Sequence, residues 1–427
     1  MREKIIRDPV HDIIAFRTDR PLERLLFSLL NAGEFQRLRR IRQLGMASLA
    51  YPGADHSRYS HSLGVMETAR KILHRLAEFH TIDKEAWTLC LVSALLHDLG
   101  HGPFSHVFER VTDVHHEALT QRVINDPESE VHQILSAFDP SLPARIVGCI
   151  GCEEGRTFVS DILCSQLDAD RFDYLLRDNL MTGSGYGSFD LRWVLQGLTI
   201  DEPTNRLAVS IKGISAVEGY LQSRFHMYRN VYFHKVVRSA EGMVKLALQR
   251  AKRLAVQGRL DWPPHGQYVQ KALLGQQLTM DEFRNLDDIA VLDCFKIWSK
   301  NPDAILARLC NGLLFRRLFK SIDLTRISDD PARIPHILAE VEGAITAAGG
   351  EPAYEMFYDS PSDTPYEAYD PTDPSSAKEI MIRTADGDLR EFAALSPLVQ
   401  ALNRQMAFQR LHFSEEYRPA VLKAVGG

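Results

Sequence analysis

The sequence predicts a mainly α-helical protein with a smaller α+β part toward its C-terminus. Residues 62–80 and 85–97 carry apolar side chains at the spacing of amphipathic or buried helices. Strand-like patterns are confined to short segments, such as residues 206–212. Residues 351–378 then hold five prolines among many Asp, Ser and Tyr residues, which indicates a long loop or lid.

The other expected elements follow from the same patterns. Helical spacing predicts further helices over 22–50, 159–180, 217–256 and, as a pair, 288–320. Residues 206–212 are expected to form half of a small hairpin. A second hairpin is expected to begin at residue 379, with Asp386-Gly387 as its turn.

The bulk composition is that of a globular protein without a membrane span. The chain has 427 residues, of which 45% are hydrophobic and 25% charged. A formal net charge of −6 argues against general binding to nucleic acid or membranes, although a locally basic pocket for a small phosphorylated substrate stays possible. The first residues lack the apolar core of a signal peptide, and no apolar run reaches the roughly 18 residues of a membrane span. We therefore expect a cytoplasmic protein.

Histidine is distributed very unevenly. Nine of the sixteen histidines lie between His56 and His116, and His61 opens one predicted helix while His97-Asp98 ends another. Two adjacent ionisable groups at the end of an apolar helix are costly to bury without a partner, and a divalent transition metal removes that cost. The alternative for a bare His-Asp pair is a hydrogen-bonded structural pair at a helix C-terminus.

Two polar stripes at helical spacing accompany the histidines. Asp170, Tyr174 and Asp178 share one face of a predicted helix at i, i+4 and i+8, with Arg171 beside them. This face offers a fourth metal ligand, a ring to pack on a sugar and an acceptor for a sugar hydroxyl. A second stripe contains Arg224, Tyr228 and Tyr232 and suits a phosphate-and-sugar pocket. Taken alone, each stripe also fits a solvated or interfacial helix face.

The order H…HD…D, given by His61, His97-Asp98 and Asp170, is the ligand pattern of the HD superfamily. The surrounding phrases resemble the branch that contains the mammalian SAM-and-HD-domain dNTP triphosphohydrolase and its bacterial relatives, although no SAM domain is expected ahead of this core. The resemblance covers roughly residues 1–325. The matching stretches are RDPVHD (7–12), FQRLRRIRQLG (35–45), YPGADHSRYSHSLGV (51–65), LLHDLGHGPFSHVFE (95–109), LDADRFDYLLRD (167–178) and YFHK (232–235).

The resemblance implies a role for individual residues. It places a divalent ion (Mn, Fe, Zn, Ni or Co) on four ligands, His61, His97, Asp98 and Asp170. It places His101, His106 and His116, with Glu117, around the α-phosphate. It implies phosphate contacts, with Mg on the triphosphate, for Arg58, Arg171 and Arg224, and contacts with the sugar or base for Gln43, Tyr174, Asp178, Tyr228 and Tyr232. Tyr232 falls where a ring blocks a 2′-hydroxyl, and Tyr228 replaces a histidine, which leaves its contact open.

The resemblance also implies a regulatory site and a division of the chain. Lys4, Gln36 and Arg39 match effector-binding positions, while Asn31 replaces the aspartate that reads guanine. The alternative is that Arg37, Arg39, Arg40 and Arg42 form a solvated basic helix face. We expect a regulatory and oligomerisation segment over 1–50, an HD catalytic core over 51–245 and a helical and α+β region over 246–427. A homo-oligomer, either a dimer or a tetramer, is expected.

The implied activity is the hydrolysis of deoxynucleoside triphosphates to deoxynucleoside and inorganic triphosphate. Activation of this hydrolysis by a bound nucleotide is also implied. Metal-activated water, the arginines and a histidine acid, His106, supply the chemistry. Two alternatives stay open: an HD phosphohydrolase of another nucleotide or phosphoester, and a regulator with vestigial catalysis. A P-loop nucleotide kinase or GTPase is disfavoured because no G-x-x-x-x-G-K-[ST] motif occurs.

Overall fold

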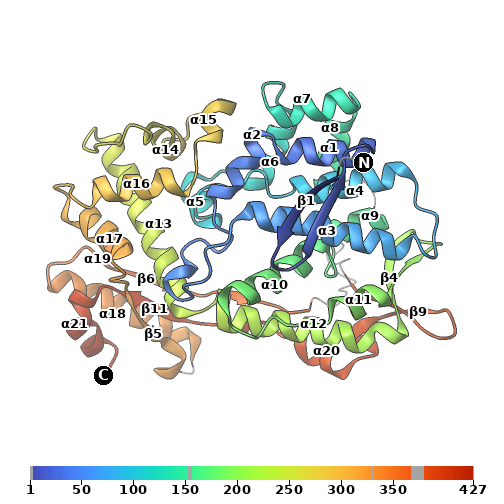
Figure 1. Ribbon diagram of the computed structural model, residues 1–427. Helices are drawn as coiled ribbons and strands as arrows, with labels where there is room; N and C mark the ends of the chain where they lie inside the picture. The colour runs from blue at the N-terminus through green and yellow to red at the C-terminus, as the bar shows by residue number, and fades with distance from the viewer. Residues whose placement is uncertain (1–2, 152–155, 329, 367–378, 427) are drawn as a thin grey trace.

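Helices make up most of the computed structural model, which describes residues 3–151, 156–328, 330–366 and 379–426 (Figure 1). The strands form only small sheets of two to four members. The mainly α class predicted from the sequence is therefore confirmed. Among the described residues, no helix combines the length and apolar character needed to cross a bilayer.

An antiparallel hairpin that the sequence did not predict begins the chain. It consists of β1 (Glu3–Asp8) and β2 (Asp12–Arg17). Ile14 and Phe16 are fully buried, whereas Ile13, the residue before Ile14, is about half exposed, so alternation along β2 places one face on the core. The helices α1 (Pro21–Leu30) and α2 (Gly33–Arg37) follow, but the rest of 22–50 holds only short 3₁₀ turns.

Three helices form the framework of the site: α3 (Arg58–Leu76), α4 (Lys84–Leu96) and α10 (Ala169–Thr182). The helix α3 packs against both α4 and α10 and shares with them the largest hydrophobic core. Asp83 caps α4 by accepting a hydrogen bond from the backbone N–H of Ala86 at 2.7 Å. The helices predicted over 62–80 and 85–97 are confirmed.

Two predicted helices are interrupted. The segment 159–180 is divided into α9 (Phe158–Cys164) and α10, because Asp168 adopts an extended conformation and caps α10 through the N–H of Arg171 at 2.8 Å. The segment 217–256 is divided into α12 (Ile214–Met227) and α13 (Lys235–Val256) by a π-helical turn, η4 (Tyr228–Tyr232). Helical periodicity persists across both breaks, so it does not reveal them.

The C-terminal region is α+β, as predicted. The helices α13, α16 (Asp288–Trp298) and α17 (Ala304–Leu314) share a second hydrophobic core, and both helices predicted over 288–320 are thereby confirmed. A third core joins α18 (Ile334–Ala347) and α21 (Arg418–Ala424) to an antiparallel sheet. In this sheet β11 (Arg410–Phe413) lies between β5 (Lys320–Asp323) and β6 (Met356–Asp359).

The prediction of a long loop over residues 351–378 is partly wrong. Its described part contains α19 (Pro352–Glu355), β6 and β7 (Ser362–Asp363), and residues 367–378 lie outside the described residues. Both predicted hairpins are present: β3 (Leu198–Asp201) with β4 (Arg206–Ser210), and β8 (Met381–Arg383) with β9 (Leu389–Glu391). The strands β4 and β8 join them in parallel. The domain boundaries near residues 50 and 245 stay a prediction.

Candidate metal centre and nucleotide cavity

The four residues of the H…HD…D pattern converge from three helices. His61 lies in the first turn of α3, His97 caps the C-terminus of α4, and Asp170 lies in the first turn of α10. One ligand atom from each of these three lies within 4.8 Å of the others. Asp98 adds a carboxylate oxygen 3.3 Å from His97 Nε2. The set offers two imidazole nitrogens and one carboxylate oxygen around one point, with the Asp98 carboxylate beside them.

Hydrogen bonds fix which nitrogen each imidazole presents to that point. His61 donates from Nδ1 to Asp173 Oδ2 at 2.9 Å, and His97 donates from Nδ1 to the carbonyl of Ala94 at 2.9 Å. Both rings therefore have Nε2, and not Nδ1, on the side of the Asp170 carboxylate. His97 Nε2 is buried and has no hydrogen-bond partner in the described structure. An orphaned nitrogen beside two carboxylates and a second imidazole fits a divalent transition-metal ion.

The electrostatics of these side chains follow from their burial together. Burial favours the neutral ring of His61, but its hydrogen bonds to Asp170 and Asp173 outweigh burial and raise its pKa to about 10. Burial opposes the charged form of Asp170 as well, yet the neighbouring rings of His61 and His97 hold its pKa well below the usual range. The carboxylates are thus ionised, as cation ligands must be.

A second cluster centres on Glu109, a residue that the sequence analysis did not single out. His101, His106 and His116 each direct Nδ1 toward its carboxylate, at 3.4, 3.4 and 3.0 Å respectively. The rings of His101 and His116 stack with centroids 3.8 Å apart. Despite burial, these histidines hold the pKa of Glu109 well below its ordinary range. The three histidines predicted around a phosphate are therefore oriented by one shared carboxylate.

Glu117, which was predicted beside these histidines, lies elsewhere. Its side chain is exposed on α6 (His116–Asn125), one residue beyond His116. The signal for Glu109 was its position on α5 (His106–Thr112), three residues after His106 and so on the same helix face. His101 links the two clusters, because its Nε2 lies 3.3 Å from Asp98 Oδ1.

A cavity of about 430 Å³ joins both clusters to a wall of tyrosines. Of the predicted substrate residues, Arg171 and Arg224 are not among the described residues that line it. Arg110, Arg238 and Glu241 line it without having been predicted. The predicted residues that line it are Gln43, Arg58, His61, Asp98, His101, His106, His116, Asp170, Tyr174, Asp178, Tyr228 and Tyr232.

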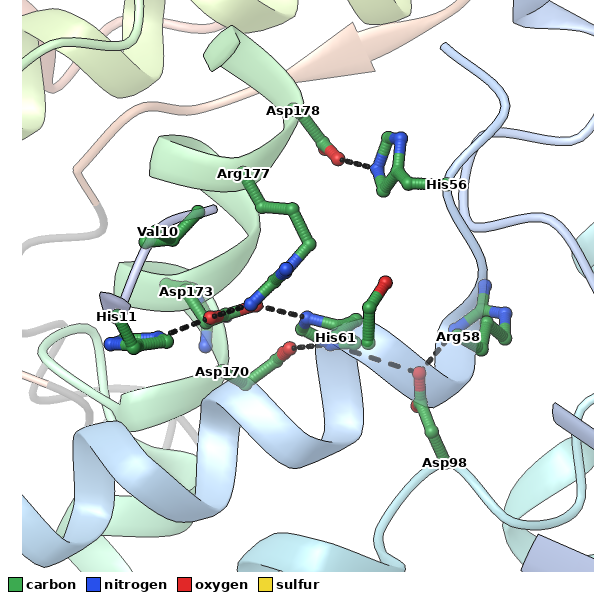
Figure 2. Close-up of polar contacts among 12 residues, drawn as sticks. Val10, His11, His56, Arg58, His61, Asp98, Asp170, Asp173, Arg177 and Asp178 are labelled. Atoms are coloured by element: carbon green, nitrogen blue, oxygen red, sulfur yellow. Dashed lines mark hydrogen bonds and ion pairs between the residues drawn. The ribbon is translucent and has the colours of Figure 1, made fainter. Parts of the chain in front are cut away.

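The tyrosine wall is held by Asp178. Tyr232 donates its hydroxyl hydrogen bond to Asp178 Oδ2 at 2.8 Å. His56 contacts Oδ1 of the same carboxylate at 2.7 Å, as Figure 2 shows. The rings of Tyr174 and Tyr228 both meet Tyr232 edge to face, with centroids 6.1 and 5.0 Å away. The π-helical turn η4 carries Tyr228 and Tyr232, and such turns are frequent at functional sites. Gln43 Oε1 is a buried acceptor with no hydrogen-bond partner among the described residues.

The predicted phosphate-binding arginines differ in their surroundings. Arg58 forms an ion pair with Asp98 and donates to Ser105 Oγ at 2.8 and 3.0 Å. Arg171 is paired with Asp168, and Arg224 contacts Asp363 at 3.1 Å. Only Arg58 of the three borders the cavity.

The predicted effector residues lie outside this cavity. Lys4 is exposed on β1. Arg39 donates to Gln36 Oε1 at 2.8 Å and stacks over the ring of Tyr59 at 3.6 Å, while the Asn31 amide donates to the carbonyl of Phe27. The alternative of a solvated basic helix face is wrong for Arg37. That side chain is fully buried over the Phe283 ring, and burial lowers its pKa to about 9.

Comparison with known proteins agrees with this arrangement. Residues 58–145 match the HD domain family, and residues 189–258 match the HD-associated region. The chain is 36% identical to the uncharacterised protein YwfO of Bacillus subtilis, over 94% of this chain and 89% of that protein. It is 29% identical to human SAMHD1, a deoxynucleoside triphosphate triphosphohydrolase, over 58% of this chain but only 44% of the human protein.

A solved structure extends the similarity to the whole fold. A phosphohydrolase of Bacteroides thetaiotaomicron superimposes with a TM-score of 0.80 at 28% identity, covering 96% of this chain and all of that one. The family matches contain His61, His97 and Asp98, and Asp170 lies between the two matched regions. The chain belongs to the HD-domain superfamily of phosphohydrolases.

Proposed function

We propose that this protein hydrolyses deoxynucleoside triphosphates to deoxynucleoside and inorganic triphosphate. The observation that carries the proposal is one cavity lined by His61 and Asp170 of the donor set, by the Tyr232–Asp178 pair and by the three histidines that face Glu109. The resemblance to deoxynucleoside triphosphate triphosphohydrolases supports the substrate class.

The residues suggest a division of labour. A divalent cation held by His61, His97, Asp98 and Asp170 would supply Lewis acidity that makes a water nucleophilic at neutral pH. Hydrolysis would form a bond from the water oxygen to the α-phosphorus and break the bond from that phosphorus to the 5′-oxygen. His106 would donate a proton to the departing 5′-oxygen, because Glu109 faces its Nδ1 and so leaves Nε2 directed away from that carboxylate. His101 and His116, oriented by the same carboxylate, would contact the α-phosphate.

The cavity also offers cations for the triphosphate. Arg58, Arg110 and Arg238 line it, and Mg²⁺ carried with the nucleotide would neutralise further charge. Arg171 and Arg224 stay predicted phosphate contacts, and their pairing with Asp168 and Asp363 adds no support to that role.

Recognition of the sugar would depend on Tyr232. The hydrogen bond to Asp178 fixes the ring against the cavity, where it would crowd a 2′-hydroxyl. Gln43 Oε1 provides an acceptor for a sugar hydroxyl, and Tyr174 provides a ring to pack on the sugar. We expect Tyr232→Ala to reduce the preference for dATP over ATP, measured as the ratio of kcat/KM values, by roughly 10- to 100-fold. Tyr232→Phe, which keeps the ring, should retain the preference, and equal turnover of dATP and ATP by the unmodified protein would contradict the assignment.

The experiment that tests the proposed function is a substrate panel. Purified protein loaded with Mn²⁺ is incubated with each dNTP and NTP, with nucleoside monophosphates and with bis(p-nitrophenyl) phosphate. The proposal predicts turnover of dNTPs above all others. Preference for a monophosphate or diester would favour another HD phosphohydrolase, and no turnover of any compound would favour a vestigial regulator.

We further propose a cytoplasmic homo-oligomer, a dimer or tetramer, that responds to a nucleotide at Lys4, Asn31, Gln36 and Arg39. Gln36 and Arg39 contact each other, which supports a shared site. We expect sigmoidal initial rates and an assembly that grows with added dNTP in light scattering, since a ligand that prefers the assembled form shifts the population toward it. Arg39→Ala should raise the half-saturating nucleotide concentration by about 5- to 150-fold. Arg42→Ala, in the same basic cluster, is the control, and hyperbolic kinetics of a monomer unaffected by Arg39→Ala would exclude this regulation.

A further inference from the structure

Asp173 is a buried carboxylate on α10 that contacts a candidate metal ligand from behind. It is fully buried and lies one helical turn after Asp170. Its Oδ2 accepts from His61 Nδ1 at 2.9 Å and from Arg177 Nε at 2.8 Å. Its Oδ1 accepts from Arg177 Nη2 at 2.9 Å and faces His11 Nε2 at 2.7 Å. Four donors therefore saturate the carboxylate and leave its orientation no freedom.

The contacts of Asp173 with His61, Arg177 and His11 form a junction, and the N-terminal hairpin supplies one side of it. His11 lies in the turn between β1 and β2, 162 residues from Asp173 in sequence, yet it is buried against that carboxylate (Figure 2). Lys71 Nζ lies 2.9 Å from His11 Nδ1, and an ammonium group can only donate. The ring therefore accepts at Nδ1 and donates from Nε2 to Asp173.

A second link ties the same turn to α10. Asp8 accepts from Arg177 Nη1 at 2.8 Å and also from the backbone N–H groups of Val10 and His11, both at 2.9 Å. Its carboxylate thus shapes the turn and at the same time holds the guanidinium that braces Asp173. Figure 2 shows the resulting row from His11 through Asp173 to His61 and Asp170.

The packing of α3 on α10 is adapted to this junction. A methyl group added at Gly64 would lie 2.0 Å from Asp173 Oδ1 and 2.3 Å from Arg177 Nη2. Only a glycine at this position of α3 admits the carboxylate and the guanidinium. The junction is therefore built into the contact between the two helices that carry His61 and Asp170.

We propose that Asp173 is the positioning residue that sets the tautomer and ring orientation of His61, and that His11 couples the N-terminal hairpin to the metal centre through it. The inference rests on the proposed metal site. An imidazole that donates to a carboxylate behind it is a more basic and better oriented ligand. Displacing the hairpin turn removes the His11 donor from Asp173 and the Asp8 acceptor from Arg177, and so loosens the carboxylate and the His61 ring that it holds. Because such coupling is reciprocal, metal binding must also steady the hairpin.

Three variants of the full-length chain test this proposal with Co²⁺ as the probe. Affinity is measured by competition with a chelator, and the ligand geometry by the visible spectrum of bound Co²⁺. We expect Asp173→Asn to weaken Co²⁺ binding by about 10- to 100-fold and to change the spectrum. His11→Phe keeps an aromatic ring but lacks both nitrogens, and should weaken binding by about 10-fold, the lower end of that range. Asp12→Asn is the matched control, because it removes only the hairpin's exposed ion pair with Arg7.

Hydrogen exchange supplies a readout that does not depend on activity. In the unmodified protein, Co²⁺ should slow amide exchange across residues 3–17, and this protection should be absent in His11→Phe and present in Asp12→Asn. If Asp173→Asn does not fold, His11→Phe decides the question alone.

The possible outcomes separate this inference from the proposed function. In one outcome, the unmodified protein binds Co²⁺ and His61→Ala does not, whereas His11→Phe binds Co²⁺ with the affinity of the unmodified protein and shows the same protection of the hairpin amides. This outcome would overturn the coupling and leave the proposed metal site in place. Failure of the unmodified protein to bind Co²⁺ would overturn both.

Discussion

His97→Ala should abolish metal retention and activity together while the protein stays folded. His97 Nε2 has no hydrogen-bond partner in the described structure and lies 3.3 Å from Asp98 Oδ1 and 3.7 Å from Asp170 Oδ1, so its loss removes a candidate ligand atom and no hydrogen bond at that atom. The Nδ1 bond to the carbonyl of Ala94 lies at the end of α4 and costs little fold stability when lost. We expect kcat/KM for dNTP hydrolysis to fall on the order of 10³-fold, the several kcal/mol that a catalytic cation contributes.

The chain contains a matched control for this substitution. His132 on α7 (Glu130–Phe138) is also half-buried and also contacts a backbone carbonyl through Nδ1, that of Ile124, at 2.9 Å. Its Nε2 faces the hydroxyl of Ser136 instead of a carboxylate pair. His132→Ala should therefore keep metal content, by elemental analysis, and activity. Full metal content in both His97→Ala and Asp98→Asn would refute the ligand assignment.

Glu109→Gln should lower kcat by about 10²- to 10⁴-fold with a smaller change in KM. The carboxylate faces Nδ1 of three histidines, and an amide replaces one of its two acceptor oxygens with a donor and removes its negative charge. His106 would then lose the carboxylate that orients it for proton transfer, and the expected loss is the range for general acid catalysis. Steady-state rates at saturating dNTP measure the effect.

Glu117→Gln distinguishes the structural assignment from the one implied by resemblance. Glu117 is exposed on α6, so the structure favours a change of less than a few-fold. A loss of activity in Glu117→Gln comparable to that in Glu109→Gln would restore Glu117 to the chemistry. Normal kcat in Glu109→Gln would remove the carboxylate from it.

The residues of the candidate metal centre could be predicted from the sequence, whereas the groups that contact them from behind could not. His61, His97, Asp98 and Asp170 form a recognisable order, and a metal needs those residue types wherever helices bring them together. Glu109 and Asp173 are acidic residues on helices, which in a sequence are indistinguishable from solvated ones. Their roles arise only from packing, since Asp173 is fully buried between α10, α3 and the N-terminal hairpin.

The helices could be predicted where the apolar pattern ran over many residues without a break. Their ends could not be predicted where a capping residue or a turn interrupted a helix. The helices α3 and α4 follow directly from apolar spacing. Asp168 ends a helical pattern by capping the next helix, and the π-helical turn η4 leaves the periodicity of its neighbours intact. The hairpin at residues 3–17 escaped prediction because one of its strands buries little apolar surface and its turn is stabilised by Asp8 and by tertiary contacts of His11.

The most direct test of the account is the identity of the phosphorus product. Purified protein, stripped with a chelator and reloaded with Mn²⁺, is incubated with dATP, and the products are resolved by ³¹P nuclear magnetic resonance and by chromatography. The account predicts equal amounts of deoxyadenosine and intact inorganic triphosphate, with none formed before the metal is restored. Release of orthophosphate with dADP, or of pyrophosphate with dAMP, would place the attack at another phosphorus or bond and contradict it.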